Sequence, residues 1–98
     1  MQTRFQPEAE AELAEAREWY AQQREGLDTH LMLRIDETLR RISDSPEAYP
    51  VVYGSLRRAV VRQFPFAIFY ELAMNEIRVV AVFHSKRNPK GWQSRVLP

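Results

Sequence analysis

Two apolar runs stand close together in the last third of the sequence, and they constrain the fold more than any other feature. The first runs from Phe64 to Leu72 and the second from Ile77 to His84. Short runs rich in aromatic and β-branched residues are typical of buried strands. The four residues between them, 73–76, have the length of a hairpin turn, and Asn75 tolerates turn geometry. We therefore expect two adjacent antiparallel strands in the centre of a sheet.

A third strand is expected directly before these two. Between Leu56 and Arg62 the chain alternates Arg58, Val60 and Arg62 with small apolar residues, which is the pattern of a half-exposed strand. Pro65 cannot donate a backbone hydrogen bond, so pairing of the next strand should begin after it.

The first half of the chain predicts two amphipathic helices. Pro7 suits the first turn of the first helix, and Gly26 is a suitable stop. Asp28 is a good N-cap for the second helix, which should end before Pro46. Each helix carries an apolar stripe at helical spacing, formed by Ala9, Leu13, Ala16 and Tyr20 in the first and by Leu31, Ile35, Leu39 and Ile42 in the second. Because few residues separate them, the helices should form an antiparallel hairpin.

These segments predict an α+β fold in one domain that spans residues 1–98. With a short first strand at Gln2–Phe5, the order is strand, helix, helix, strand, strand, strand, followed by a short C-terminal tail. The helical hairpin should pack on one face of a small antiparallel sheet, because this arrangement buries both apolar stripes.

The composition narrows the possible functions. The chain has no cysteine, which excludes disulfides and thiolate metal sites and suits a reducing cytoplasm. His30 has no set of ligands at convincing spacing, so we expect no metal, and no nucleotide motif indicates a cofactor. No apolar run reaches the roughly 20 residues of a membrane span, and none has signal-peptide length near the N-terminus. We expect a cytoplasmic protein.

The charge is divided between the two halves of the chain. Residues 1–50 contain six arginines and eleven acidic residues, whereas residues 51–98 contain eight basic and two acidic residues. Either the C-terminal half presents a basic face to an acidic partner, or the two halves neutralise each other within the fold.

Several motifs together resemble a known family. They are the start Phe5-Gln6-Pro7-Glu8-Ala9, the pairs Trp19-Tyr20 and Arg57-Arg58, the strand Phe64-Pro65-Phe66-Ala67-Ile68-Phe69-Tyr70, and the tail His84-Ser85-Lys86-Arg87-Asn88-Pro89 through Trp92. This set is similar to the RelE/ParE superfamily of bacterial toxins, which belong to type II toxin–antitoxin, or plasmid stabilisation, systems. The resemblance covers essentially the whole chain.

The resemblance implies one of two activities. RelE-like members cut messenger RNA on the ribosome, whereas ParE-like members inhibit DNA gyrase by protein–protein binding and cause growth arrest. Members of both branches are held inactive by a cognate antitoxin. If this chain were a metal-independent endoribonuclease, His84 could act as acid or base, and Arg58, Arg62 and Arg87 could stabilise the charged phosphorane.

One departure favours the ParE branch. RelE-like ribonucleases usually carry a catalytic basic residue shortly before the tyrosine of the middle strand, but here Phe66, Ala67, Ile68 and Phe69 occupy that stretch. We therefore expect a gyrase inhibitor and assign no catalytic residue. The candidate target-binding residues are Arg58, Arg62, His84, Lys86, Arg87, Trp92 and Arg95. The candidate antitoxin-binding residues are Leu13, Tyr20, Leu31 and Ile35.

Other interpretations of the same residues stay open. His84 could be a hydrogen-bonded structural residue, Arg58 and Arg62 could pair with acids of the first helix, and Trp92 could pack the tail against the domain. The chain could also be an inactive protein that binds only its antitoxin. It could form a homodimer or a hetero-oligomer with the antitoxin.

Overall fold

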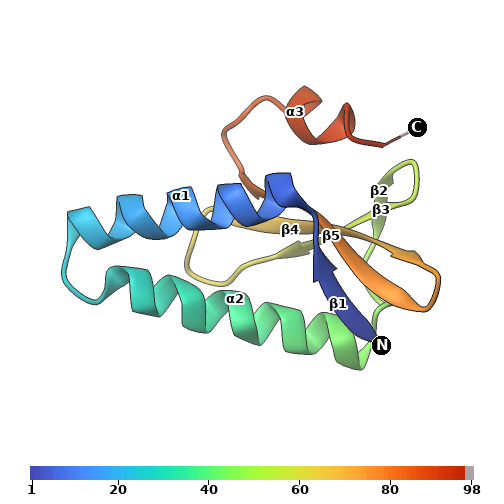
Figure 1. Cartoon of the computed structure of the whole chain (residues 1–98), viewed down its shortest axis with the longest axis horizontal. Helices are drawn as coiled ribbons and strands as arrows, with labels where there is room; N and C mark the ends of the chain where they lie inside the picture. Colours follow the sequence, from blue (N-terminus) through green and yellow to red (C-terminus); the bar gives the residue numbers. More distant parts are fainter. Residues whose placement is uncertain (97–98) are drawn as a thin grey trace.

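A five-stranded sheet packs against a long helical hairpin (Figure 1). The computed structural model describes residues 1–96. The elements in chain order are β1 (Gln2–Phe5), α1 (Pro7–Gln23), α2 (Leu27–Asp44), β2 (Val51–Tyr53), β3 (Leu56–Val60), β4 (Phe66–Ala73), β5 (Glu76–His84) and α3 (Lys90–Gln93). This confirms the predicted α+β class and the helical hairpin on a sheet.

The two helices form where the apolar stripes predicted them. Ala9 and Ala16 of α1 and Leu31, Ile35 and Ile42 of α2 are buried in one core cluster, and Leu13, Tyr20 and Leu39 pack against it. The boundary between the helices differs from the prediction. Gly26 adopts a left-handed φ of 84° and is the N-cap of α2, so Asp28 lies inside the first turn. A left-handed residue turns the chain sharply, and glycine adopts this conformation without strain.

The sheet has the order β1-β5-β4-β3-β2. β4 pairs antiparallel with both β3 and β5, and it starts at Phe66, directly after Pro65, as predicted. Two details differ from the prediction. β1 pairs parallel with β5, because the hairpin returns the chain across the sheet face, and β2 is an additional strand. β2 has only three residues after Pro50, too few for a clear alternation in the sequence.

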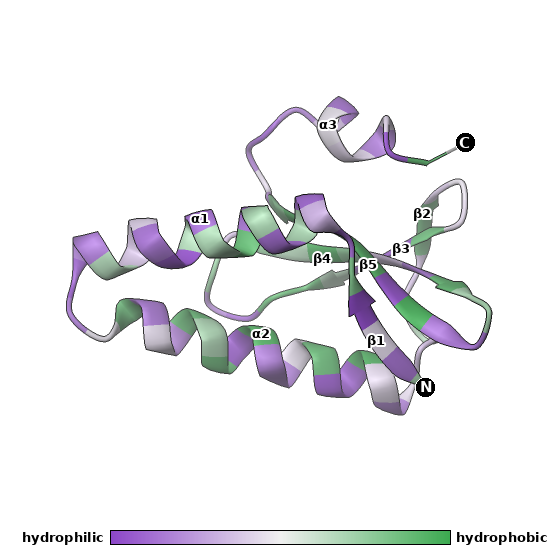
Figure 2. Ribbon diagram, in the orientation of Figure 1, coloured by the Kyte–Doolittle hydropathy of each residue, from purple (hydrophilic) through white to green (hydrophobic). Residues whose placement is uncertain are grey.

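Each face of the sheet carries its own apolar cluster. One face packs on the helices through residues that include Ile68, Tyr70 and Val79. The opposite face carries Phe69, Phe83 and their neighbours, and Trp92 of α3 covers part of it. Figure 2 shows green, hydrophobic stretches concentrated on β4 and β5, whereas the helices alternate between green and purple. Because both faces of the central strands are buried, their sequences are continuously apolar.

Candidate functional site

Two hollows lie on either side of the turn that follows β5. The helix-side hollow, of about 360 Å³, lies between α1 and the end of the sheet, and Ala16, Trp19, Tyr20 and Val82 are among its lining residues. The tail-side hollow, of about 420 Å³, lies on the opposite face of the sheet beside α3. Phe66, His84 and Arg87 line both hollows. This shared rim contains two of the candidate residues that the sequence predicted, His84 and Arg87.

His84 is held in place by the turn that it starts. It ends β5 opposite Phe66, and the two rings meet edge to face with centroids 5.2 Å apart. The backbone N–H of Lys86 donates to Nδ1 of His84 at 3.1 Å. Since Nδ1 accepts this bond, the proton of the neutral ring resides on Nε2. The turn therefore sets both the position and the tautomer of His84.

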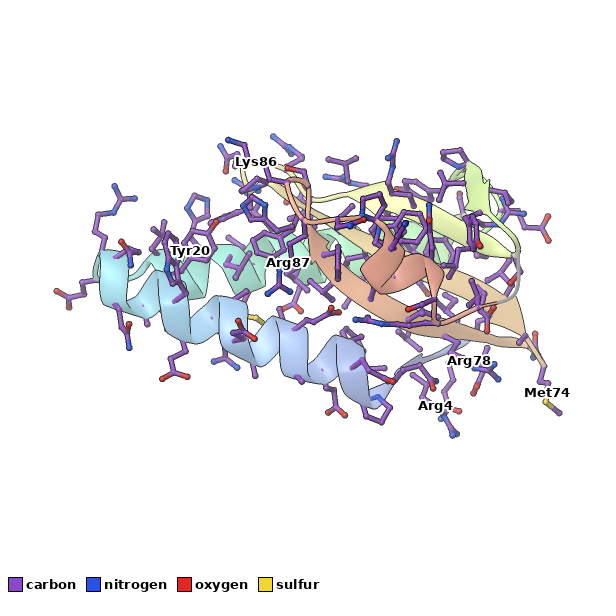
Figure 3. All side chains as sticks on the ribbon, turned by 90° about the horizontal axis from the view of Figure 1, so that it is seen from above. Arg4, Tyr20, Met74, Arg78, Lys86 and Arg87 are labelled. Atoms are coloured by element: carbon purple, nitrogen blue, oxygen red, sulfur yellow. The ribbon has the colours of Figure 1, made fainter. Side chains whose placement is uncertain are left out.

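The side chain of Arg87, in the turn after β5, is held only weakly by its neighbours. Arg87 is exposed, lies 5.6 Å from the centre of the Phe83 ring, and reaches Glu15 of α1 only at 3.9 Å. Lys86 is exposed beside it on the same turn, and Figure 3 shows both on the tail (labelled Lys86 and Arg87). An exposed pair at this distance contributes little to stability, so the Arg87 guanidinium is available for a partner.

Arg58 and Arg62 do not share a face. Arg58 lies on β3 and lines the tail-side hollow together with His84 and Arg87. Arg62 follows the strand and donates to Oε1 of Glu37 on α2 at 3.0 Å. The strand ends between the two arginines, and the chain then turns toward α2, so sequence alternation no longer predicts the direction of Arg62.

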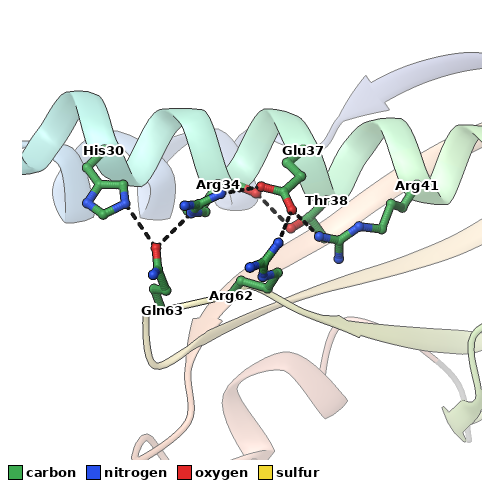
Figure 4. Close-up of polar contacts among 7 residues, drawn as sticks. All are labelled: His30, Arg34, Glu37, Thr38, Arg41, Arg62 and Gln63. Atoms are coloured by element: carbon green, nitrogen blue, oxygen red, sulfur yellow. Dashed lines mark hydrogen bonds and ion pairs between the residues drawn. The ribbon is translucent and has the colours of Figure 1, made fainter.

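Glu37 is the centre of a polar network on α2 (Figure 4). Its carboxylate accepts from Arg34 at 2.6 Å, from Arg62, and from Arg41. The hydrogen bond from Arg34, followed by the contributions of Arg62 and Arg41, lowers the pKa of Glu37 to about 2, although desolvation opposes this shift. Arg62 is thus part of an internal network, and its partner acid lies on the second helix rather than on the first.

The same network fixes the loop between β3 and β4. Gln63 adopts a left-handed φ of 67°, which is unfavourable for a residue with a side chain. Its Oε1 accepts from Arg34 Nε at 2.9 Å and lies 3.0 Å from His30 Nε2. The two helical side chains therefore hold a strained loop residue, and His30 makes a structural contact there.

Trp92 and Arg95 attach the tail to the domain. The Trp92 ring stacks on Phe69 with centroids 4.2 Å apart and meets Tyr53 edge to face. Arg95 forms two hydrogen bonds to the carboxylate of Glu12 and a third to the carbonyl of Val80. These contacts favour the structural interpretation of Trp92 and give Arg95 a structural role as well.

Two of the candidate antitoxin-binding residues are buried and cannot be reached from the surface. Leu31 and Ile35 are 1% and 0% exposed, because α2 packs them directly against the sheet. Their side chains cannot meet a partner while the domain is folded. Leu13 is half-buried, and Tyr20 lines the helix-side hollow, where burial raises the pKa of its hydroxyl. Trp19 beside it is 55% exposed.

Glu12 is a residue that sequence reasoning missed. Its Oε1 accepts the backbone N–H of Val82, and both its oxygens bind Arg95. Glu12 lies on the partly polar side of α1 among other glutamates, so nothing in the sequence distinguishes it. Only the packing of α1 beside β5 gives this carboxylate its partners.

The two hollows differ in the acid–base groups that line them. His84 lines both, Glu12 and Glu15 line the helix-side hollow, and no carboxylate is among the described residues of the tail-side hollow. Within residues 1–96, no group of three or more histidines and acids is arranged to hold a metal ion. In that same range, no helix has the length and apolar character needed to cross a membrane.

Comparison with known proteins identifies the family. A family model described as the ParE toxin of the type II toxin–antitoxin system parDE matches residues 3–89. The chain belongs to this family. It is therefore a toxin of the ParE branch of the RelE/ParE superfamily, as the resemblance implied.

A solved structure has the same fold as this ParE-family toxin. It is described as the chromosomal ParDE TA system from P. aeruginosa, and the comparison gives a TM-score of 0.74 at 15% identity. The match covers 88% of this chain and 97% of the other. Among curated proteins, no sequence matches the chain. At this identity the structural likeness concerns the fold.

Proposed function

We propose that this toxin inhibits DNA gyrase in the cytoplasm by binding it, and that a cognate antitoxin neutralises the toxin. The match of the ParE family model over residues 3–89 carries this proposal. The proposed target surface combines His84 and Arg87 of the rim with two exposed cations, Arg58 and Lys86. Arg62, Trp92 and Arg95 are omitted because their contacts lie within the domain.

The composition of the rim supports binding rather than cleavage. RNA cleavage without a metal needs a base for the 2′-hydroxyl and an acid for the leaving oxygen. On β4, the residues that line the tail-side hollow are Phe66, Ala67 and Phe69, which can do neither. In the tail-side hollow, His84 would have to perform both steps alone, because the arginines there are poor proton donors.

A second function is favoured by one observation. Arg58, His84 and Arg87 line the same hollow, which is the minimum set for a RelE-like ribosome-dependent endoribonuclease. In that case His84 would transfer protons, and the two arginines would bind the phosphate oxygens.

Assays with purified protein separate these functions. We expect the toxin to inhibit supercoiling of relaxed plasmid by gyrase and to leave transcripts intact in a translation reaction. The double variant Lys86→Ala/Arg87→Ala should weaken gyrase inhibition, because it removes two exposed cations of the proposed target surface. Arg4→Ala is the matched control, since Arg4 is an exposed arginine on β1, at the far edge of the sheet.

Three results would contradict the proposal. Cleaved transcripts that disappear with His84→Ala would identify the ribonuclease. A folded protein that affects neither reaction, and whose expression leaves growth unchanged, would be an inactive antitoxin-binding protein. Equal inhibition by the rim variant and the wild type would place the gyrase contact elsewhere.

A further inference from the structure

The sheet ends at β1, and the outer edge of this strand is open. β1 is the first strand in the order β1-β5-β4-β3-β2 and pairs only with β5 (Figure 1). Two hollows flank it. One, of about 490 Å³, includes residues of α1 in its lining, and the other, of about 430 Å³, is lined mostly by α2. Thr3 lines both hollows and is exposed, so neither helix covers the middle of the edge.

The backbone groups of Thr3 point out of the sheet. The N–H of Gln6 donates to the carbonyl of Val79, and the parallel ladder pairs Phe5 with Val79. In this register the residues of β1 that bond to β5 are Arg4 and Gln6. Backbone groups alternate in direction along a strand, so the N–H and C=O of Thr3 and of Phe5 face outward.

The neighbouring stretch of β5, beyond the end of β1, is closed by side chains. Glu12 accepts the N–H of Val82, and Arg95 donates to the carbonyl of Val80. The fold thus caps the backbone groups of β5 where β1 no longer covers them. Within residues 1–96, no side chain bonds the outward groups of Thr3 in the same way. An uncapped edge is a template for an added strand.

A two-fold axis through Thr3 pairs this edge with itself. In an antiparallel pair, two outward-facing residues that lie opposite each other exchange both of their hydrogen bonds. With Thr3 opposite Thr3 of a second copy, Arg4 lies opposite Gln2, and Phe5 lies opposite Met1. The alternative register, with Thr3 opposite Phe5, places Arg4 opposite Arg4. Because like charges directly opposite each other are destabilising and threonine pairs are favourable, the register centred on Thr3 is preferred.

The charges around the edge suit a second copy better than a highly charged partner. Arg4 and Glu10 line the first hollow, and Asp36 and Arg40 line the second, so each sign occurs twice. This balance provides no excess charge to attract a nucleic acid or a strongly acidic segment. Leu33, which lines the second hollow, is 54% exposed and adds apolar surface beside the strand.

From this geometry we propose that β1 is the docking edge for a second copy of this chain. Two β1 strands pair antiparallel about Thr3 and join the two sheets into one. Because the strand is short, we expect a weak dimer with a dissociation constant in the micromolar range. The dimer does not depend on the proposed function but extends it. β1 ends beside Val79, and the contact uses neither His84 nor Arg58, so one dimer presents two copies of the proposed target surface.

Analytical ultracentrifugation of the purified full chain, over a range of concentrations, tests the inference. Thr3→Pro removes the outward N–H without removing a bond to β5, and an edge position tolerates proline. Because the two copies exchange these bonds, one substitution removes two hydrogen bonds, and the dissociation constant should rise by about thirtyfold. Arg4→Ala is the matched control. The backbone groups of Arg4 face β5 and its side chain lies opposite Gln2, so the constant should stay within about threefold.

A charge exchange at Thr3 tests the register and keeps the backbone unchanged. Thr3 is exposed, so Thr3→Lys and Thr3→Asp should both fold, which circular dichroism checks. Each variant alone should dimerise about fivefold more weakly, with a smaller effect at high salt, because its charge faces the same charge across the two-fold axis. An equimolar mixture of the two variants should associate at least as tightly as the wild type. Only a residue that lies opposite itself is rescued in this way.

The outcomes separate this inference from the proposed function. A chain that stays monomeric up to about 1 mM overturns the dimer, while the toxin assignment and the proposed function stand. A dimer that Thr3→Pro leaves unchanged uses another surface, and a mixture of charge variants that stays weak excludes the register about Thr3; each result overturns the inference. Amide exchange at Thr3 that slows only when another protein or an oligonucleotide is added identifies a different occupant and overturns it as well. Absence of gyrase inhibition would contradict the proposed function and leave the dimer intact.

Discussion

Arg95 and Glu12 are 83 positions apart in the chain and form a two-point ion pair. Nη2 of Arg95 lies 2.8 Å from Oε2 of Glu12, and Nη1 lies 3.0 Å from Oε1. The side chains are only 20% and 10% exposed. The hydrogen bonds that Arg95 donates to Glu12 raise the pKa of Arg95 above its usual value, despite opposing desolvation. This pair joins the tail, α1 and the edge of β5.

We expect Glu12→Ala to lower the free energy of unfolding by about 2 kcal/mol, because it leaves the Arg95 guanidinium and the Val82 N–H without their acceptor. Glu12→Gln should cost about half as much, since its amide oxygen can still accept from Val82. Urea denaturation measures both. Glu10→Ala is the control, as Glu10 is an exposed acid near the start of the same helix. Equal stability of Glu12→Ala and Glu10→Ala would show that the ion pair contributes nothing.

The Glu37 network predicts a dependence of stability on pH. The folded pKa of Glu37 is about 2, below the ordinary value of 4.5, so ionised Glu37 stabilises the folded state. This contribution is fully present above about pH 4.5 and is lost as the pH falls toward 2. Denaturation of the wild type and of Glu37→Gln at several pH values should therefore give curves that converge in this range. Asp36→Asn, an exposed neighbour, should not show the same convergence.

Gly91 is required by a close approach of the tail to the sheet. A Cβ at this position would lie 2.6 Å from the tip of the Phe83 ring, and that ring is 6% exposed. Helix propensity alone would favour alanine by about 1 kcal/mol, but the steric overlap should outweigh it. We expect Gly91→Ala to reduce stability by about 1 kcal/mol in thermal denaturation. In a Phe83→Leu background the same change should be neutral or stabilising; if it costs as much there, the ring is not the cause.

The turn between β4 and β5 offers a stabilising change. Met74 and Asn75 have φ of 52° and 61°, which is the geometry of a type I′ turn, and Met74 is 92% exposed. Asparagine followed by glycine suits this turn best. We expect Met74→Asn/Asn75→Gly to raise the melting temperature, with a gain of about 1 kcal/mol. Met74→Val should lower it, because a β-branched residue is strained at positive φ; equal melting temperatures for the two variants would contradict the assignment.

The sequence by itself determined the local elements. Residue periodicity and the positions of Pro7 and Pro65 were sufficient for the two helices and the three longer strands, because hydrophobic spacing and backbone restrictions act over a few neighbouring residues. The sequence also shows directly that no basic residue lies in Phe66–Phe69. This absence favoured the ParE branch, and the match to the ParE family model agrees with it.

The tertiary structure decided which side chains meet. Only the path of the chain reveals the parallel pairing of β1 with β5, the separation of Arg58 from Arg62, and the pairing of Arg95 with Glu12. It also shows that Leu31 and Ile35 are buried, whereas the Val60 side chain is exposed. Contacts between residues many positions apart depend on how whole elements pack, and no local pattern records that arrangement.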